Sequence, residues 1–166
     1  MLSKKMEQAL NEQINRELFS SYLYLSMAAY FEDSNLPGFA SWMQVQSQEE
    51  YMHAMKFYSF IHERRGRVTL KAIEEPKPKW KSPLDAFQEA FKHEQFITGH
   101  INELANMALK DKDHATHIFL QWFITEQVEE ENSADEIVQK LKMIGDSQQG
   151  LFMLNREMGF RGQAGK

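Results

Sequence analysis

Four long stretches of the chain carry apolar side chains at the three-and-four spacing of a buried helix face, and this pattern limits the fold to a helical one. The sequence has only four prolines and eight glycines, and they fall where such helices should begin and end. We therefore expect long helices over residues 3–33, 37–65, 83–110 and 114–144, and a short fifth helix over residues 147–158.

The connections between these helices predict how the helices are arranged. Residues 34–36 and 111–113 are short polar turns, which join antiparallel neighbours. Ser34 or Asn35 is expected to cap the second helix, Ser82 the third and Asp113 the fourth. Residues 67–81 contain Pro76 and Pro78 and read as extended chain, which can span roughly 50 Å. Such a crossover matches the length of a long helix, about 45 Å, and sets the third helix parallel to the second.

The expected fold is therefore all-α: an up-up-down-down four-helix bundle with one long crossover and a short C-terminal helix. We expect one domain over residues 1–160 and a flexible tail over residues 161–166.

Composition excludes several classes of function. The chain of 166 residues has no cysteine, so neither a disulfide framework nor a thiolate metal site can form. A net charge of −5 argues against a nucleic-acid partner, because phosphate binding needs a basic surface. No apolar run approaches the roughly 20 residues of a membrane span. The N-terminal residues are polar and do not resemble a signal peptide, so a cytoplasmic protein is expected.

Each apolar stripe is interrupted near its middle by an acid, an amide or a histidine. The midpoints of the four helices lie near residues 18, 51, 96 and 129. A midpoint keeps its level whichever way a helix runs, so these side chains should converge on one layer of the bundle. The converging residues are Glu17, Glu50, His53, Glu94, Gln127 and Glu130.

Buried carboxylates in such a layer need bound cations. An isolated buried carboxylate costs several kcal/mol or takes up a proton, and four of them repel one another. The four stripes contain no lysine or arginine, so two divalent ions are the simplest source of compensating charge. Oxygen ligands with one imidazole suit iron or manganese. Glu50 and His53, three residues apart on one face, have the Glu-x-x-His spacing of di-iron carboxylate bundles.

The alternative interpretation is that these are ordinary polar residues. A single glutamate on a helix is usually a solvated surface residue, and one Glu-x-x-His arises easily by chance. The coincidence of four stripes at one level is harder to obtain by chance. It depends on the assigned stripes, since rotating the first or third helix by one residue would weaken it.

The same residues carry a resemblance to a known family. Glu17, the segment from Glu50 to His53, Glu94 and the segment from Gln127 to Glu130 resemble the ferroxidase centre of bacterial non-haem ferritins. The resemblance extends over residues 2–159, including the crossover and the fifth helix.

The resemblance implies a set of metal ligands. One iron would be held by Glu17, Glu50 and His53. A second would share Glu50 as a bridge and add Glu94 and Glu130, with Gln127 beside it. A third position in bacterial members would use Glu49, Glu126, Glu129 and Glu130, although a solvated acidic helix face would explain this cluster as well.

Further expectations follow from the resemblance. Tyr24 would hydrogen-bond a ligand and supply an electron, and Trp122 could lie near it as an ordinary core aromatic. Haem is not expected, because Tyr51 stands where the haem methionine of bacterioferritins would be. Residues in and after the turn at 111–113 could line pores of the cage, although helix capping explains these residues nearly as well. They are Asp111, Asp113, His114 and His117.

The implied function is iron storage with ferroxidase activity. Fe(II) would be oxidised by dioxygen or peroxide, and the ferric product would be stored as a hydrated oxide inside a cage of 24 subunits. One alternative is a di-iron oxidase or a rubrerythrin-like peroxidase, against which the missing cysteines and the missing second Glu-x-x-His argue. The other is a helical scaffold whose core acids are protonated.

Overall fold

The computed structural model describes residues 1–161, and these form five helices and no strand. The helices are α1 (Lys4–Asp33), α2 (Pro37–Glu63), α3 (Pro83–Lys110), α4 (His114–Ile144) and α5 (Gln148–Met158). The expected all-α architecture is thus confirmed. None of these helices combines the length and the apolar character that crossing a bilayer requires.

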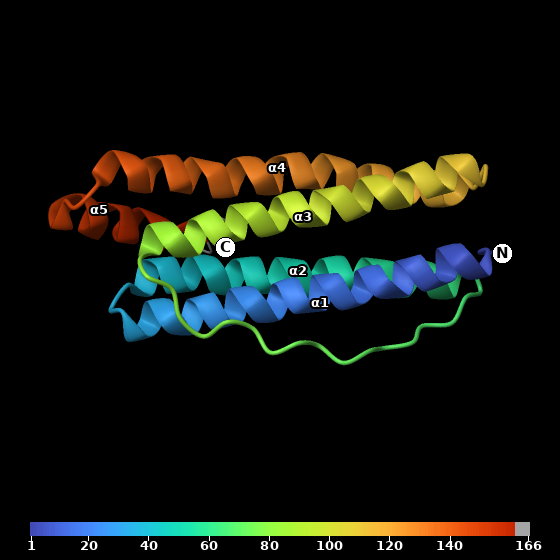
Figure 1. Cartoon of the computed structure of the whole chain (residues 1–166), viewed down its shortest axis with the longest axis horizontal. Helices are drawn as coiled ribbons and strands as arrows, with labels where there is room; N and C mark the ends of the chain where they lie inside the picture. The colour runs from blue at the N-terminus through green and yellow to red at the C-terminus, as the bar shows by residue number, and fades with distance from the viewer. Residues whose placement is uncertain (162–166) are drawn as a thin grey trace.

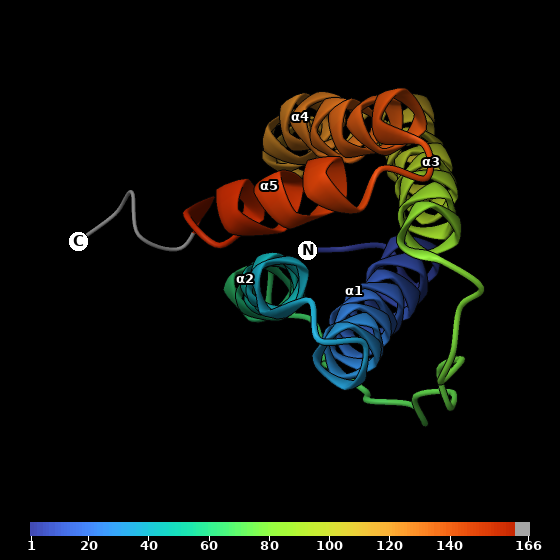
Figure 2. The same ribbon diagram turned by 90° about the vertical axis from the view of Figure 1, so that its left-hand side faces the viewer.

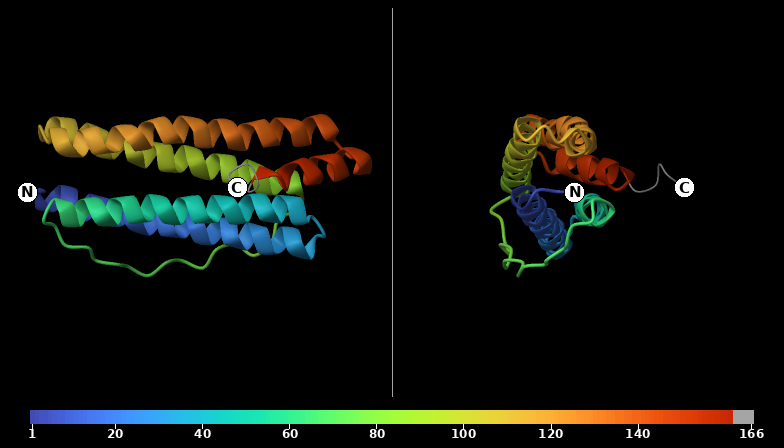
Figure 3. Two further views of the ribbon diagram at one scale, coloured as in Figure 1. Left: turned by 180° about the vertical axis from the view of Figure 1, so that it is seen from behind. Right: turned by 90° about the vertical axis from the view of Figure 1, so that its right-hand side faces the viewer.

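The four long helices lie side by side as two hairpins (Figures 1 and 3). α1 and α2 pack closely as one hairpin and α3 and α4 as the other. The crossover that connects the two hairpins runs the length of the bundle along its outside, next to α1 (Figure 1). α3 is therefore parallel to α2, as expected. In chain order the directions are up, down, down, up, because each short turn reverses the chain. The label up-up-down-down, which needs two long crossovers, is corrected accordingly.

Helix ends follow the capping residues in most places. Ser82 accepts a hydrogen bond from the backbone of Asp85, and Asp113 accepts one from Thr116, as expected. The expected cap of α2 is wrong: Leu36 occupies that position without a side-chain hydrogen bond, and Asn35 instead takes a turn conformation with φ of 57°. α2 also ends at Glu63, before the expected residue 65.

Polar side chains of α1 hold the crossover against the bundle. Asn11 donates from Nδ2 to the carbonyl of Arg67 and accepts from the backbone of Thr69 at 2.6 Å. Further along α1, Asn15 donates to the carbonyl of Ala72. Because extended chain lacks internal hydrogen bonds, these side chains satisfy part of its backbone. Asn11 and Asn15 thus hold the crossover along α1, where it runs roughly parallel to the helix axis (Figure 1).

The short helix α5 completes the start of α2. Asn155 Oδ1 accepts from the backbone nitrogens of Gly38 and Phe39, at 2.9 and 3.2 Å, and so supplies the cap that the sequence lacks locally. A Cβ atom at position 38 would lie 1.6 Å from the carbonyl oxygen of Asn155, so only glycine allows this approach. Figure 2 shows α5 between the ends of α2 and α4.

The apolar interior is divided into two clusters along the bundle. One contains Phe31, Phe39 and Phe87 with Leu154 from α5. The other lies toward the opposite end. Its larger members include Met6, Leu10, Phe57, Ile97 and Phe123. Each of the four long helices contributes to both clusters, and most of the buried polar residues lie between the two clusters along each helix.

The expected tail begins at Arg161, whose side chain is ordered by contacts with α2. The rest of that tail, residues 162–166, lies outside the described residues.

Replacing Gly38 tests how α5 is attached. We expect Gly38→Ala to lower the free energy of unfolding by about 1–3 kcal/mol, because the methyl group must displace the backbone of α5. Thermal and denaturant unfolding of the variant would measure this. Gly99→Ala is the matched control: its Cβ meets nothing, so the helix should gain about 0.5–1 kcal/mol. Equal effects of both substitutions would contradict the docking of α5.

Candidate metal centre

Four glutamates and a histidine from all four long helices meet in the layer between the two apolar clusters. Their side chains are among the most buried polar groups of the chain, with exposures from 1% to 5%. They are Glu17 of α1, Glu50 and His53 of α2, Glu94 of α3 and Glu130 of α4. The chain thus brings together five of the residues that sequence reasoning placed at one level.

These side chains form overlapping groups in which one atom from each member lies within 4.8 Å of the others. One group joins Glu17, Glu50 and His53, and another joins Glu50, Glu94 and Glu130. Glu50 belongs to both groups. A third group joins His53, Glu126 and Glu130.

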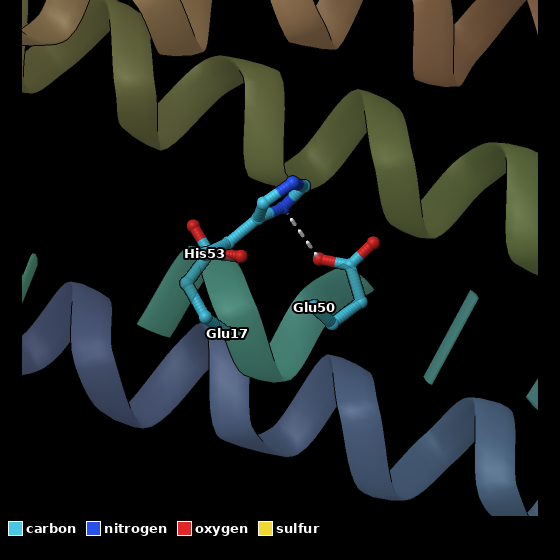
Figure 4. A group of neighbouring side chains, drawn as sticks. All are labelled: Glu17, Glu50 and His53. Carbon is cyan, nitrogen blue, oxygen red and sulfur yellow. Dashed lines mark hydrogen bonds and ion pairs between the residues drawn. The ribbon is translucent and has the colours of Figure 1, made fainter. Parts of the chain in front are cut away.

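The local helix geometry explains the pairing on α2. Residues three apart lie on one helix face, and His53 Nδ1 is 3.2 Å from Glu50 Oε2. Figure 4 shows both side chains pointing away from α2 into the bundle, with the Glu17 carboxylate reaching up from α1 toward the histidine. The ring of His53 is held edge-on by Trp122 and Phe123, at centroid distances of 5.4 and 6.0 Å.

Tyr24 and Gln127 surround Glu94 from two sides. The hydroxyl of Tyr24 donates to Glu94 Oε1. Gln127 donates from Nε2 to Glu94 Oε2 and to Thr98 Oγ1, each at 3.2 Å. In this arrangement Gln127 therefore presents a donor to a neighbouring carboxylate rather than an oxygen to a metal. Trp122, expected near Tyr24, packs against His53 instead.

The residues suggested for a third iron position are less closely gathered. Glu126 Oε1 lies 3.9 Å from His53 Nε2, next to Glu130. Glu49 is near enough for its charge to raise the pKa of Glu130, but its carboxylate pairs with Arg161 at 2.6 Å. Glu129 is exposed and joins none of the ligand groups found among the described residues.

Of the four suggested pore residues, one has a structural role within the chain and the other three lie at least partly exposed at the same end of the bundle. Asp113 caps α4 and pairs with Arg64 at 3.0 Å, which is the role that helix capping predicted. Asp111 and His114 are exposed at the same end of the bundle, and His117 is half-buried there.

Burial makes the carboxyl groups hold protons when no cation is present. Loss of hydration, with the charge of Glu50, raises the pKa of Glu17 to about 8. Burial raises the pKa of Glu94 and that of Glu130 to about 7, and that of Glu50 well above its usual range. Among the ion pairs of the described residues, the only partner of Glu50 is His53, and no lysine or arginine pairs with these four carboxylates.

Several supporting residues were missed by the sequence reasoning. Gln13 donates to Glu17 Oε1 at 2.8 Å, and Gln46 donates to Glu50 and Glu130 at 2.9 and 2.6 Å. Gln13 precedes Glu17 by one helical turn, and that spacing was the available signal. His93 bonds Ser20 Oγ at 2.7 Å and packs on Tyr24. Burial lowers its pKa to about 4, so it is neutral there.

The donor set fits hard or borderline divalent cations. Four carboxylates and one imidazole, with Glu50 shared, match the ligand preference of iron or manganese. Glu17 Oε2 is buried without a hydrogen-bond partner, as a ligand oxygen awaiting a cation would be.

Comparisons with known proteins give one family. Residues 7–144 match the family model described as a ferritin-like domain. The chain is 42% identical to a bacterial non-heme ferritin of Bacteroides fragilis, over 97% of this chain and 100% of that protein. A bacterial non-heme ferritin of Staphylococcus haemolyticus is 40% identical, over 97% of each chain. The crystal structure of an open pore ferritin from Archaeoglobus fulgidus has a TM-score of 0.96 and 53% identity, covering 97% of this chain and 99% of that one.

The raised pKa values predict how the stability of the metal-free protein depends on pH. The folded protein holds protons that the unfolded chain releases above about pH 4.5, so this stability is full below that pH and is lost as the pH rises through about 7 to 8. We expect the melting temperature of metal-free protein to fall between about pH 5.5 and 8.5, by calorimetry in the presence of chelator.

Glu17→Gln should flatten this dependence and stabilise the metal-free protein at about pH 8.5 by about 2–4 kcal/mol, because no buried charge then forms. Glu75→Gln, at an exposed position of the crossover, is the control and should leave the pH dependence unchanged. An unchanged slope in Glu17→Gln would show that the buried carboxylates do not govern it.

Proposed function

The chain belongs to the ferritin family, whose members store iron, and on that premise we propose that it oxidises Fe(II) inside its own helix bundle before storage. The observation that carries this proposal is the pair of ligand groups joined by Glu50, in a layer where no lysine or arginine of the described residues pairs with the carboxylates. Such a layer is stable with ionised carboxylates only when divalent cations are bound.

We assign one Fe(II) to Glu17, Glu50 and His53, and a second to Glu50, Glu94 and Glu130. Glu50 would bridge the two ions, since it is the member common to both groups. Gln13 orients Glu17, and Gln127 orients Glu94 by donating to it. These amides keep the ligand oxygens in place, which is the usual task of groups around a metal site.

The reaction needs two reduced ions side by side. Each Fe(II) loses one electron, and the pair together reduces dioxygen by two electrons to the level of peroxide. Tyr24 lies against Glu94 and is proposed to supply a further electron when only partial reduction has occurred. Its pKa is raised well above the usual value by burial, so it stays protonated at this site.

The bound iron is substrate and must leave after oxidation. The site lacks a second histidine, since α4 offers Gln127 and Glu130 where a Glu-x-x-His would stand in symmetric di-iron proteins. Glu126 next to His53 and Glu130 offers a neighbouring position on the way out. A weakly held second ion with an adjacent acceptor suits a site that passes iron onward.

Storage requires assembly, because one bundle cannot enclose a mineral. We propose a cage of 24 chains with hydrated ferric oxide inside, in the cytoplasm. Several large apolar side chains on α1 and α5 are exposed in the single chain and would be covered by neighbouring subunits. They are Tyr22, Leu25, Phe152 and Met153, with exposed fractions from 49% to 69%.

Anaerobic titration followed by air tests the ferroxidase proposal. We expect metal-free protein to bind two Fe(II) per chain, the second more weakly than the first, and to oxidise them on admission of dioxygen, as followed by absorbance and oxygen uptake. Glu50→Gln removes the shared ligand and should slow the initial oxidation by roughly 10–100-fold or more. Glu103→Gln has the same charge change at a distant surface position and should behave like the parent protein. Full activity of Glu50→Gln would refute the assignment.

Particle mass tests the assembly separately. Analytical ultracentrifugation of purified protein should show a species about 24 times the chain mass of 19.5 kDa, and iron loading should increase its density. A stable species at the mass of one or two chains would exclude storage inside a cage, whatever the activity of the centre.

A further inference from the structure

Arg161, the last residue that the structure describes, reaches back to α2 beside the proposed iron centre. Its Nη1 donates to Gln46 Oε1 at 2.7 Å and its Nη2 to Glu49 Oε2 at 2.6 Å. The guanidinium also lies over the ring of Trp42, with 4.1 Å from Cζ to the ring centroid. Two hydrogen bonds and an aromatic face therefore fix a side chain that is only 25% exposed.

These contacts extend to the proposed ligands through Gln46. A guanidinium only donates hydrogen bonds, so the amide of Gln46 must turn its oxygen toward Arg161. Its nitrogen then faces inward and donates to Glu50 Oε1 and Glu130 Oε2. Both acceptors belong to the group with Glu94. Arg161 thereby orients the Gln46 amide so that its nitrogen, not its oxygen, faces the proposed ligands.

We propose that Arg161 controls cation binding on the Glu49 side of the centre. This inference rests on the proposed iron-oxidising function. While the guanidinium holds Gln46 and Glu49, Glu49 is not available as a ligand. A third cation binds to Glu49 only when the arginine side chain has left it. Arg161 is therefore a positioning residue and a competitor for the third cation, not a ligand.

Charge explains why the Arg161 guanidinium and a third metal ion exclude each other at Glu49. Glu49 Oε2 accepts a hydrogen bond from Arg161 Nη2 at 2.6 Å, so the positive guanidinium lies directly beside the carboxylate and repels a divalent ion there. An ion that binds to Glu49 must displace this hydrogen bond from a charged donor. Because the pair is partly exposed, we expect about tenfold weaker binding of the third ion than without the arginine. The two positions around Glu50 then fill first.

Equilibrium metal binding tests this without any oxidation step. Metal-free full-length protein would be titrated with Zn²⁺ by calorimetry, comparing the parent with Arg161→Gln. We expect two ions per chain around Glu50 in both proteins, and a third ion bound about tenfold more tightly in Arg161→Gln. Glu49→Gln placed in the Arg161→Gln protein should remove that gain.

Two further variants separate charge from a structural effect. Arg156→Gln removes the same charge from an exposed position of α5 and should leave all affinities unchanged. Arg161→Lys keeps a positive charge beside Glu49 and should bind the third ion about as weakly as the parent. A crystal structure of the Zn²⁺-loaded parent at high Zn²⁺ would show whether an ion at Glu49 coincides with a displaced arginine.

The outcomes distinguish this inference from the proposed function. If the parent binds no Zn²⁺ in the layer around Glu50, the proposed centre itself is refuted. If two ions bind there but Arg161→Gln has the same third affinity as the parent, only the role of Arg161 is refuted. An ion coordinated by Glu49 with both arginine hydrogen bonds still present would also overturn it.

Discussion

The cost of placing four carboxyl groups in a dry layer determines much of this structure. Glu17, Glu50, Glu94 and Glu130 are withdrawn from water between two apolar clusters. Without cations they are compatible with folding because burial raises their pKa values and protons neutralise them near neutral pH. In the proposed function divalent cations replace those protons, and the desolvation that weakens the metal-free protein in alkaline solution would favour their binding.

The four long helices place the buried carboxyl groups at one level of the bundle. Each long helix contributes its polar residues at mid-length, and the apolar clusters on either side fix the rotation of that helix. The crossover is held along α1 by Asn11 and Asn15, so that α3 starts at the correct end. α5 then caps α2 through Asn155. The ligand layer thus depends on contacts a long way from it along each helix.

The groups around the ligands determine how the centre works. Amides from Gln13, Gln46 and Gln127 each donate to a carboxylate, so the ligand oxygens are oriented before a cation arrives. On one side the amide of Gln46 continues to Arg161, which also neutralises Glu49. The proposed centre is thus flanked on one side by the pair of Arg161 with Glu49, whereas Glu126 lies beside His53 and pairs with no lysine or arginine among the described residues.

The sequence by itself determined the helices, the antiparallel hairpins, the parallel crossover and the layer of polar residues. All of these follow from local rules, namely the 3.6-residue period, the turn residues and the reach of an extended chain. The five residues that meet at the layer could be predicted because a midpoint is independent of helix direction. The helix directions are up, down, down, up and not the expected up-up-down-down, although the expected pairing of the helices is confirmed.

Only the tertiary structure decided which polar groups face one another. Asn155 caps a helix more than a hundred residues away, and Arg161 pairs with Glu49, and no spacing in the sequence encodes contacts between separate helices. Likewise the amide of Gln127 faces Glu94 as a donor, which depends on the relative rotation of α3 and α4. Helix periodicity fixes which side of a helix is buried, but packing between helices fixes what each buried side chain meets.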